Sequence, residues 1–256
     1  MKLISNPHFC SLGTLILCAL FSGAHVFASA QPKVYFQYGL VYDIGCRDLT
    51  KDLQVDRQAS DYLTKKSIML EARDLTNQLQ DLWNRTGQEL LERAIKLTGR
   101  PYDRHEITTN TSACEYGSMS APLIISIRRG LRSVRKSPAP LSTFIESSVH
   151  EILHVYLSST FDDSKSQILQ SNTFSSRPAL FKNHLHVFAL MHRVFELENR
   201  SDLTARAREL YVDISKGDYA KAWEEGTNPS LRDKLIEEIR LTPGNGSKNW
   251  PFDEKY

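Results

Sequence analysis

The residues with the clearest chemical meaning form the segment His150-Glu151-Ile152-Leu153-His154. Two histidines four residues apart on a helix lie one turn above each other, so both imidazoles can point at a single metal ion. Glu151 directly follows the first histidine, where its carboxylate can take a proton from a water on that ion. The spacing therefore predicts a metal centre at His150 and His154, with Glu151 as the catalytic general base.

The surroundings of this segment favour a functional motif over an accidental one. Glu151 is the only charged residue between positions 147 and 160, and most of its neighbours there are apolar. A buried glutamate between two buried histidines is costly unless a metal ion or a similar partner compensates its charge. The other interpretation is a solvated helix that carries the three residues by chance, and the apolar flanks speak against it.

This segment resembles the zinc-binding helix of the zincin metallopeptidases, over the five motif residues and their apolar flanks. The resemblance implies Zn²⁺ as cofactor, a peptide or protein substrate, and a lower helical lobe that supplies a third ligand. It also implies an edge strand, near residues 123–127, that aligns an extended substrate. Leu157 and Thr160 occupy the positions where metzincins have a glycine and a histidine, so the chain is not a metzincin.

The third metal ligand is expected from the later part of the chain. On a helix, His184 shares a face with Phe188 and Phe195, which should pack inward, so His184 is the preferred ligand. His186 is the alternative third ligand, on a face with a polar neighbour. Three further possibilities stay open: Glu196, Glu198, or no third ligand.

A peptidase site also needs a group that stabilises the developing oxyanion. Tyrosines are available at positions 156, 211 and 219, and their spacing selects none of them. A separate basic run contains Arg128, Arg129, Arg132, Arg135 and Lys136. We interpret it as a solvated loop beside the cleft, with the binding of an anionic partner as the alternative.

Hydrophobic patterning predicts an α+β chain, a mainly helical zincin-like fold with a small sheet packed on the active-site helix. Strands are expected over residues 34–42, 106–111 and 121–127, and helices over 56–97, with a break near Gly87. A capping box from Thr143 to Glu146 should start the motif helix, which should run to about Ser158. Asn183 should cap a helix over residues 184–198, followed by helices over 202–215, 218–225 and 230–241.

The first thirty residues have the pattern of a signal peptide. Lys2 is their only charged residue, an apolar run covers residues 12–21, and Ala28-Ser29-Ala30 fits a cleavage site. We therefore expect a signal peptide over residues 1–30 and one zincin-like domain over 31–256, with an upper lobe to about residue 158 and a lower helical lobe over 159–256. Two cysteines remain, Cys46 and Cys114, and in a secreted or periplasmic protein they should form a disulfide.

Composition limits the possible partners. The chain has 32 basic and 30 acidic residues, so without Lys2 the basic count is 31, and this balance gives no reason to expect nucleic acid. No second apolar run is long enough to span a membrane. The resulting hypothesis is a secreted zinc-dependent metallopeptidase. The alternatives are a secreted zinc-stabilised binding or interaction protein without catalysis, and a helical envelope protein without a metal.

Overall fold

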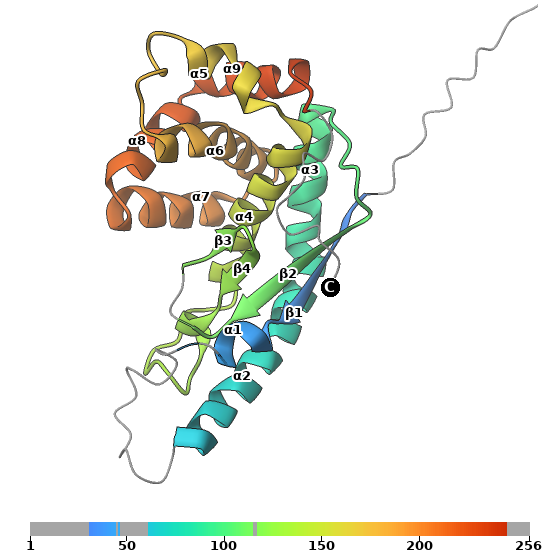
Figure 1. Cartoon of the computed structure of the whole chain (residues 1–256), viewed down its shortest axis with the longest axis vertical. Helices are drawn as coiled ribbons and strands as arrows, with labels where there is room; N and C mark the ends of the chain where they lie inside the picture. Colours follow the sequence, from blue (N-terminus) through green and yellow to red (C-terminus); the bar gives the residue numbers. More distant parts are fainter. Residues whose placement is uncertain (1–30, 45, 47–60, 115–116, 245–256) are drawn as a thin grey trace, which may run out of the picture.

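A computed structural model describes residues 31–44, 46, 61–114 and 117–244. The predicted signal peptide, residues 1–30, lies outside this part of the chain. The described residues form a mainly helical α+β structure with one four-stranded sheet (Figure 1), as the sequence predicts. None of the described helices is long and apolar enough to cross a membrane.

The sheet has the strand order β1-β2-β4-β3. Its strands are β1 (Lys33–Tyr38), β2 (Glu106–Ser112), β3 (Met119–Ser120) and β4 (Leu123–Ser126). Strands β1, β2 and β4 are parallel, whereas β3 runs antiparallel to β4. The prediction that residues 123–127 form an edge strand is therefore wrong, because β3 pairs outside β4 and takes the edge itself.

Parallel β1 and β2 require a crossover, which the long predicted helix provides. It comprises α2 (Asp61–Leu82), a π-helical turn η1 (Trp83–Gly87) and α3 (Gln88–Thr98). The helix is not broken near Gly87 as predicted: residue 87 keeps a helical backbone, and the irregularity is the π-helical turn that ends there, with the fully buried Trp83 ring over Gly87. A Cβ atom at position 87 would lie 2.2 Å from that ring. The missing side chain lets the helix hold the indole against the sheet, where it also contacts Phe36.

The first strand is shorter than predicted. Residues 40–42 were expected to continue it, but they belong to the short helix α1 (Leu40–Ile44). This turn brings the buried Asp43 carboxylate to the end of β2, where it accepts hydrogen bonds from the Ser112 hydroxyl and from the backbone amides of Ala113 and Cys114. The Tyr38 hydroxyl donates a further bond of 2.6 Å. The need to satisfy this carboxylate and these amides outweighs the β propensity of residues 40–42.

The predicted disulfide is confirmed beside this network. Cys46 and Cys114 are bonded, with a Cα–Cα distance of 5.9 Å. Cys114 also donates its amide to Asp43, so two constraints hold the chain where it leaves β2.

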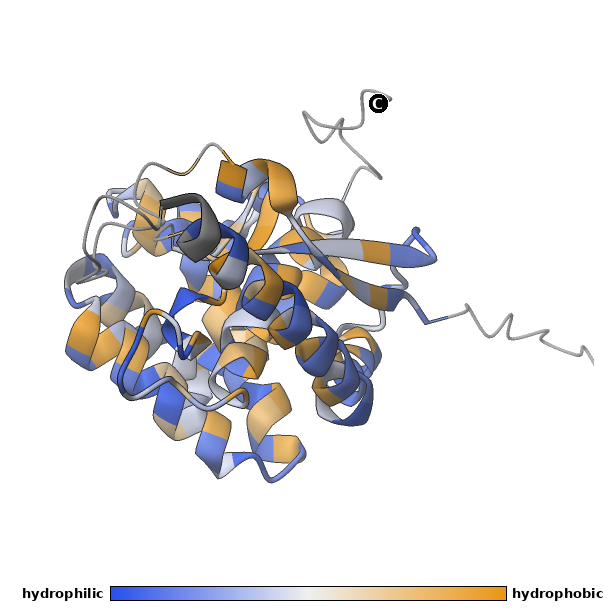
Figure 2. Ribbon diagram, turned by 90° about the horizontal axis from the view of Figure 1, so that it is seen from below, coloured by the Kyte–Doolittle hydropathy of each residue, from blue (hydrophilic) through white to orange (hydrophobic). Residues whose placement is uncertain are grey.

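Helix α4 (Thr143–Thr160) carries the motif and lies between the sheet and the remaining helices (Figure 1). Those helices are α5 (Gln167–Gln170), α6 (Ala179–Leu197), α7 (Ser201–Arg208), the π-helical η4 (Glu209–Ile214), α8 (Gly217–Thr227) and α9 (Pro229–Leu241). Short 3₁₀ turns, η2 (Arg128–Gly130) and η3 (Asp163–Lys165), precede and follow α4. Hydrophobic and hydrophilic residues alternate along most helices (Figure 2), which is typical of elements that bury one face. Helices α4 and α6 are more apolar, because other elements cover them on several sides.

Helices α6 and α8 approach each other closely at Gly226. A Cβ atom at this position would lie 2.8 Å from the carbonyl oxygen of Leu185, a backbone atom of α6. Only a residue without a side chain allows this separation. The absent side chain at position 226 therefore sets the distance between the two helices.

Two predicted helix caps are wrong. Ser142 is the residue before α4, and its side chain makes no capping hydrogen bond. The Thr143 hydroxyl accepts a 2.8 Å bond from Arg206, and Glu146 is turned into the protein interior instead of back to the helix end. Helix α6 begins at Ala179 after Pro178, so Asn183 lies inside it and caps nothing. At α4, tertiary contacts use the residues that local patterning assigns to the cap, whereas at α6 the helix simply begins earlier than predicted.

Candidate metal centre

Three imidazoles converge where α4 meets α6. One nitrogen from each of His150, His154 and His184 lies within 4.8 Å of the other two, and no other group of histidine, cysteine or carboxylate side chains in the described part of the chain is arranged in this way. The two Nε2 atoms of His150 and His154 are 3.2 Å apart. Tetrahedral zinc ligands at about 2.0 to 2.1 Å from the ion lie about 3.3 Å from each other. The helical pair thus has the spacing of two ligands on one ion.

A hydrogen bond fixes the tautomer of His184. Its Nδ1 lies 2.7 Å from the carbonyl oxygen of Leu180, one helical turn earlier. Because a carbonyl only accepts, Nδ1 carries the proton, and the Nε2 lone pair is left for a cation. Metal-binding histidines commonly have such a second hydrogen bond.

Neighbouring rings hold His150 in place. Its Nδ1 is buried and has no hydrogen-bond partner among the described residues. The ring stacks on Tyr211 at a centroid distance of 4.9 Å and on His184 at 5.2 Å, and Phe188 lies at 5.4 Å. Aromatic packing therefore orients this imidazole where a hydrogen bond does not.

All three imidazoles are held in the neutral form. Burial, followed by repulsion from His154 and His184, places the pKa of His150 well below its usual range. Burial and the charge of His184 lower the pKa of His154 to about 3, and burial also lowers the pKa of His184. A metal ion binds the neutral imidazole, so at pH 7 three lone pairs face one point. This donor set fits a divalent cation.

Glu151 is buried next to this triad, with 8% of its surface exposed. Burial, followed by the charge of the nearby Glu146, raises the pKa of its carboxyl to about 8. A cation at the triad would oppose both effects, because an opposite charge at close range favours the carboxylate. Glu151 is therefore a carboxyl group whose protonation is sensitive to a metal ion at this site.

Glu146 is a second buried carboxyl group at the site, four residues before His150. It is 2% exposed, and Ser147 donates a hydrogen bond to one of its oxygens. Burial raises its pKa to about 7, against the opposing effects of the Tyr211 hydroxyl, Ser147 and Arg206. The sequence did not predict this role, because a capping box also accounts for a glutamate at position 146. The spacing Glu146, His150, His154 was the available signal, since it places all three on one face of the helix.

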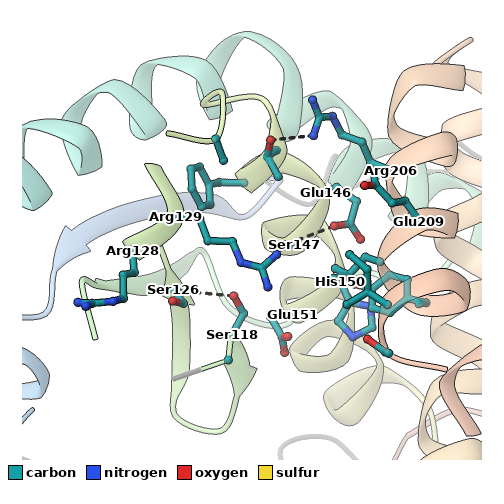
Figure 3. A pocket seen from close by; sticks show the side chains of 18 of the residues that line it. Ser118, Ser126, Arg128, Arg129, Glu146, Ser147, His150, Glu151, Arg206 and Glu209 are labelled. Atoms are coloured by element: carbon teal, nitrogen blue, oxygen red, sulfur yellow. Dashed lines mark hydrogen bonds between the residues drawn. The ribbon is translucent and has the colours of Figure 1, made fainter. Parts of the chain in front are cut away.

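An open cleft reaches the triad from two sides. One cavity of about 470 Å³ extends from His150 and Glu151 toward η2 and α7 (Figure 3). A second cavity of about 520 Å³ extends from the same residues past His154 and His184 toward α5. Ser118 and Tyr219 line both cavities, so they form one cleft with the triad at its middle. The edge strand β3 lines the second cavity, with both its residues.

The other candidates for the third ligand lie elsewhere. His186 Nε2 is 2.8 Å from the Glu238 carboxylate, outside the triad. Glu198 pairs with Arg93, and Glu196, which is half exposed, pairs with Arg193 and Arg232. Of the residues considered from the sequence, only His184 joins the motif histidines.

Of the three tyrosines considered as oxyanion donors, two lie at the triad and one does not. The Tyr156 hydroxyl donates to the carbonyl oxygen of Arg100 and contacts Thr98, away from the cleft. Tyr211 stacks on His150, and Tyr219 lies edge-on to His184 at a centroid distance of 4.5 Å. Tyr219 lines both halves of the cleft and makes no side-chain hydrogen bond to another described residue, which makes it the better placed of the two to meet a bound molecule.

The basic run is not uniformly solvated. Arg128 is buried and donates a hydrogen bond to the carbonyl oxygen of Ala113. Arg129 and Arg135 are exposed and line the first cavity. Within the predicted loop, η2 provides the turn that separates the buried arginine from the exposed ones.

Comparison with known proteins gives no relative. No protein family, curated protein or solved structure matches this chain. A function for it must therefore come from its own residues and geometry.

Proposed function

We propose that this chain is a zinc-dependent peptidase, with Zn²⁺ held by His150, His154 and His184 and with Glu151 as general base. The supporting observation is the convergence of three neutral imidazoles from two helices beside a buried carboxyl group. All-nitrogen donor sets suit zinc among the common biological cations, whereas magnesium and calcium prefer oxygen ligands. The similarity of residues 150–154 to the zincin helix makes peptide hydrolysis the proposed reaction.

Zinc at such a site supplies Lewis-acid activation of water, and it lowers the pKa of that water from about 15.7 toward 7. Glu151 accepts the proton of the attacking water. A cation at the triad would lower the raised pKa of this carboxyl and keep it ionised, as a general base must be. The same carboxyl can then deliver the proton to the leaving amine.

The tyrosine next to the triad completes the proposed site. Tyr219 can donate a hydrogen bond to the developing oxyanion of the substrate carbonyl. The edge strand β3, in place of the predicted residues 123–127, supplies backbone groups on one wall of the cleft. An extended peptide can pair with such an edge.

A structural zinc site in a binding protein is the rival function. Structural sites are usually closed by a fourth protein ligand, whereas catalytic sites keep that position open. Among the described residues, no fourth ligand joins the triad, and cavities adjoin it on both sides. These observations favour catalysis over a closed site.

The test measures zinc content and peptide hydrolysis in the same preparations. We expect the purified wild-type chain to bind one zinc per molecule and to cleave unstructured peptides. Glu151→Gln should keep the zinc and lose nearly all turnover, since it removes only the base. Glu224→Gln is the matched control, because Glu224 is exposed on α8 and lines neither cavity.

Two results would count against the proposal. A wild-type chain that takes up no zinc after refolding or dialysis with the metal cannot be a zinc enzyme. Full activity in Glu151→Gln would remove Glu151 from the reaction and leave the closed-site or binding function as the better explanation.

A further inference from the structure

The two halves of the cleft differ in chemistry. We call the cavity on the η2 and α7 side the basic arm and the cavity on the α5 side the mixed arm. The mixed arm is lined by apolar side chains such as Leu157 and Phe161 and by polar ones such as Ser158 and Asn183, and it contains one lysine and no arginine. The basic arm instead has four arginines in its lining. A molecule bound across the triad therefore meets arginines on one side only.

Besides the buried Arg128, three arginines line the basic arm. Arg129 and Arg135 come from η2 and the loop after it, and Arg206 comes from α7. In Figure 3 the Arg129 side chain extends into the cavity between Ser118 and Ser147. Arg206 donates one hydrogen bond to Thr143, whereas the side chains of Arg129 and Arg135 have no hydrogen bond or ion pair with any other described residue. Two guanidinium groups are thus available to an incoming ligand.

The acidic groups of the same arm form no ion pair with Arg129 or Arg135. Glu146 is buried and bonded to Ser147, and Glu151 is assigned to the reaction next to the triad. Glu209 is exposed and forms no ion pair with a described arginine. With a dication at the triad added, the basic arm has an excess of positive charge. An anionic ligand group is therefore favoured there over a neutral or cationic one.

We propose that the basic arm binds a carboxylate of the peptide substrate, through Arg129 and Arg135. This inference rests on the proposed peptidase function and narrows its substrate class to peptides with a carboxylate near the cleaved bond. An arginine fork matches a carboxylate in shape and can make two parallel hydrogen bonds to it. The carboxylate can come from an aspartate or glutamate side chain or from the peptide C-terminus, since both offer the same chemistry.

The test is a binding measurement that does not require hydrolysis. Three pools of unlabelled octapeptides are titrated calorimetrically into zinc-loaded Glu151→Gln protein. Each pool has one fixed central residue, and its other positions are random but never acidic. The first pool has a central Glu and an amidated C-terminus, the second a central Gln and an amidated C-terminus, and the third a central Gln and a free C-terminal carboxylate. We expect the first or third pool to bind about ten- to a hundredfold more tightly than the second, the range of a charged hydrogen bond. The tighter of the two identifies the source of the carboxylate.

Arginine variants link this preference to the basic arm. In the Glu151→Gln background, Arg129→Gln with Arg135→Gln should bind all three pools alike. Arg73→Gln with Arg85→Gln is the control of equal net charge, because both residues are exposed and line neither arm. The protein with Arg73→Gln and Arg85→Gln should keep its preference for peptides with a carboxylate. In protein that keeps Arg129 and Arg135, raising the ionic strength from about 0.05 to 0.5 M should weaken the preference for carboxylate-bearing peptides. This measurement tests the role of charge without a substitution in the basic arm.

Clear outcomes overturn the inference. Equal affinity for the three pools, or a preference that survives the loss of Arg129 and Arg135, excludes carboxylate binding in the basic arm. Failure of the peptidase proposal would look different. It would appear as missing zinc or missing hydrolysis, while the dependence of peptide binding on these arginines is measured separately on protein that does not turn over.

Discussion

The Nε2 nitrogen of His186 lies 2.8 Å from a carboxylate oxygen of Glu238. The same carboxylate accepts hydrogen bonds from the Ser166 hydroxyl and the Ile168 amide, so it joins α6 and α9 to the start of α5. His186 is only two residues from His184, yet the two imidazoles point to different partners. One side of α6 faces the triad, and another side is tied to α9.

This arrangement predicts different effects of two alanine substitutions on α6. His184→Ala should lower zinc affinity by at least about tenfold, because it removes a ligand. His186→Ala should keep the zinc but lower the free energy of unfolding by about 1 to 3 kcal/mol, since the partly buried Glu238 loses a partner. Isothermal titration with zinc and urea unfolding of the two variants check this prediction. Equal zinc affinity in His184→Ala and wild type would show that the third ligand is assigned wrongly.

The buried carboxyl Glu146 predicts a dependence of stability on pH. Its pKa is raised to about 7 in the folded protein, chiefly by burial. A carboxyl with a raised pKa stabilises the fold most below its unfolded value, and this contribution is lost as the pH rises through the folded value. Between pH 4.5 and pH 7 the loss is about 3 kcal/mol. Glu146→Gln stays neutral and should not show this loss.

The measurement compares urea unfolding of wild type and Glu146→Gln, both stripped of metal, across this pH range. Wild type should lose stability relative to the variant as the pH rises. The comparison is needed because His150, His154 and His184 act in the opposite direction. Their lowered pKa values cost stability as the pH falls below about 6.5. A difference between wild type and Glu146→Gln that stays constant with pH would contradict the prediction, and Glu224→Gln should give such a constant difference.

Tyr219 predicts a kinetic effect without a change in metal content. Its ring contacts His184, and its hydroxyl has no other described partner, so it is available to the substrate carbonyl. Tyr219→Phe should lower kcat by about a hundredfold, the size of effect seen when an oxyanion donor is lost, and leave zinc binding unchanged. Steady-state kinetics on a cleaved peptide measure this effect. Tyr35→Phe, at an exposed position of β1, should be neutral, and an unchanged kcat in Tyr219→Phe would assign the oxyanion donor elsewhere.

Substitution of Asp43, which lies outside the metal centre, should cause a large loss of stability. Its carboxylate accepts bonds from two hydroxyls and two backbone amides at the end of β2. Asp43→Asn keeps the shape but replaces one acceptor oxygen by a donor that faces other donors. The free energy of unfolding should fall by about 2 to 4 kcal/mol, as expected for a broken buried network. Thermal unfolding of oxidised protein checks this value, with Asp74→Asn on the exposed side of α2 as control.

The motif helix was predictable because its information is local. His150, Glu151 and His154 lie within five residues on one element, so the helical period alone brings the two imidazoles together. The disulfide followed from a similarly simple count, since two cysteines remain after the first thirty residues. The strand order was harder to predict, because β3 has only two residues and gives almost no pattern of its own.

Choosing between His184 and His186 from the sequence was a weaker inference. The preferred residue lies at the triad, but both histidines are buried, at 7% and 4% exposure. Other elements cover helix α6 on nearly every side. An apolar face of this helix therefore does not indicate whether it packs against α4 and the triad or against another helix. Glu146 was missed for a related reason, and Arg129 was named only as part of a basic run. Their places in the cleft depend on how α4 packs against η2 and η4, which no local pattern encodes.

The missing side chain of Gly226, about two helical turns after Tyr219, governs how close this tyrosine can come to the triad. Gly226 and Tyr219 both belong to α8, and α8 can lie against α6 only because position 226 presents no carbon to the Leu185 carbonyl. A methyl group added at position 226 would push α8 away from α6, and the Tyr219 ring would move away from His184. The reach of the proposed oxyanion donor is thus adjusted at a position that no substrate can touch.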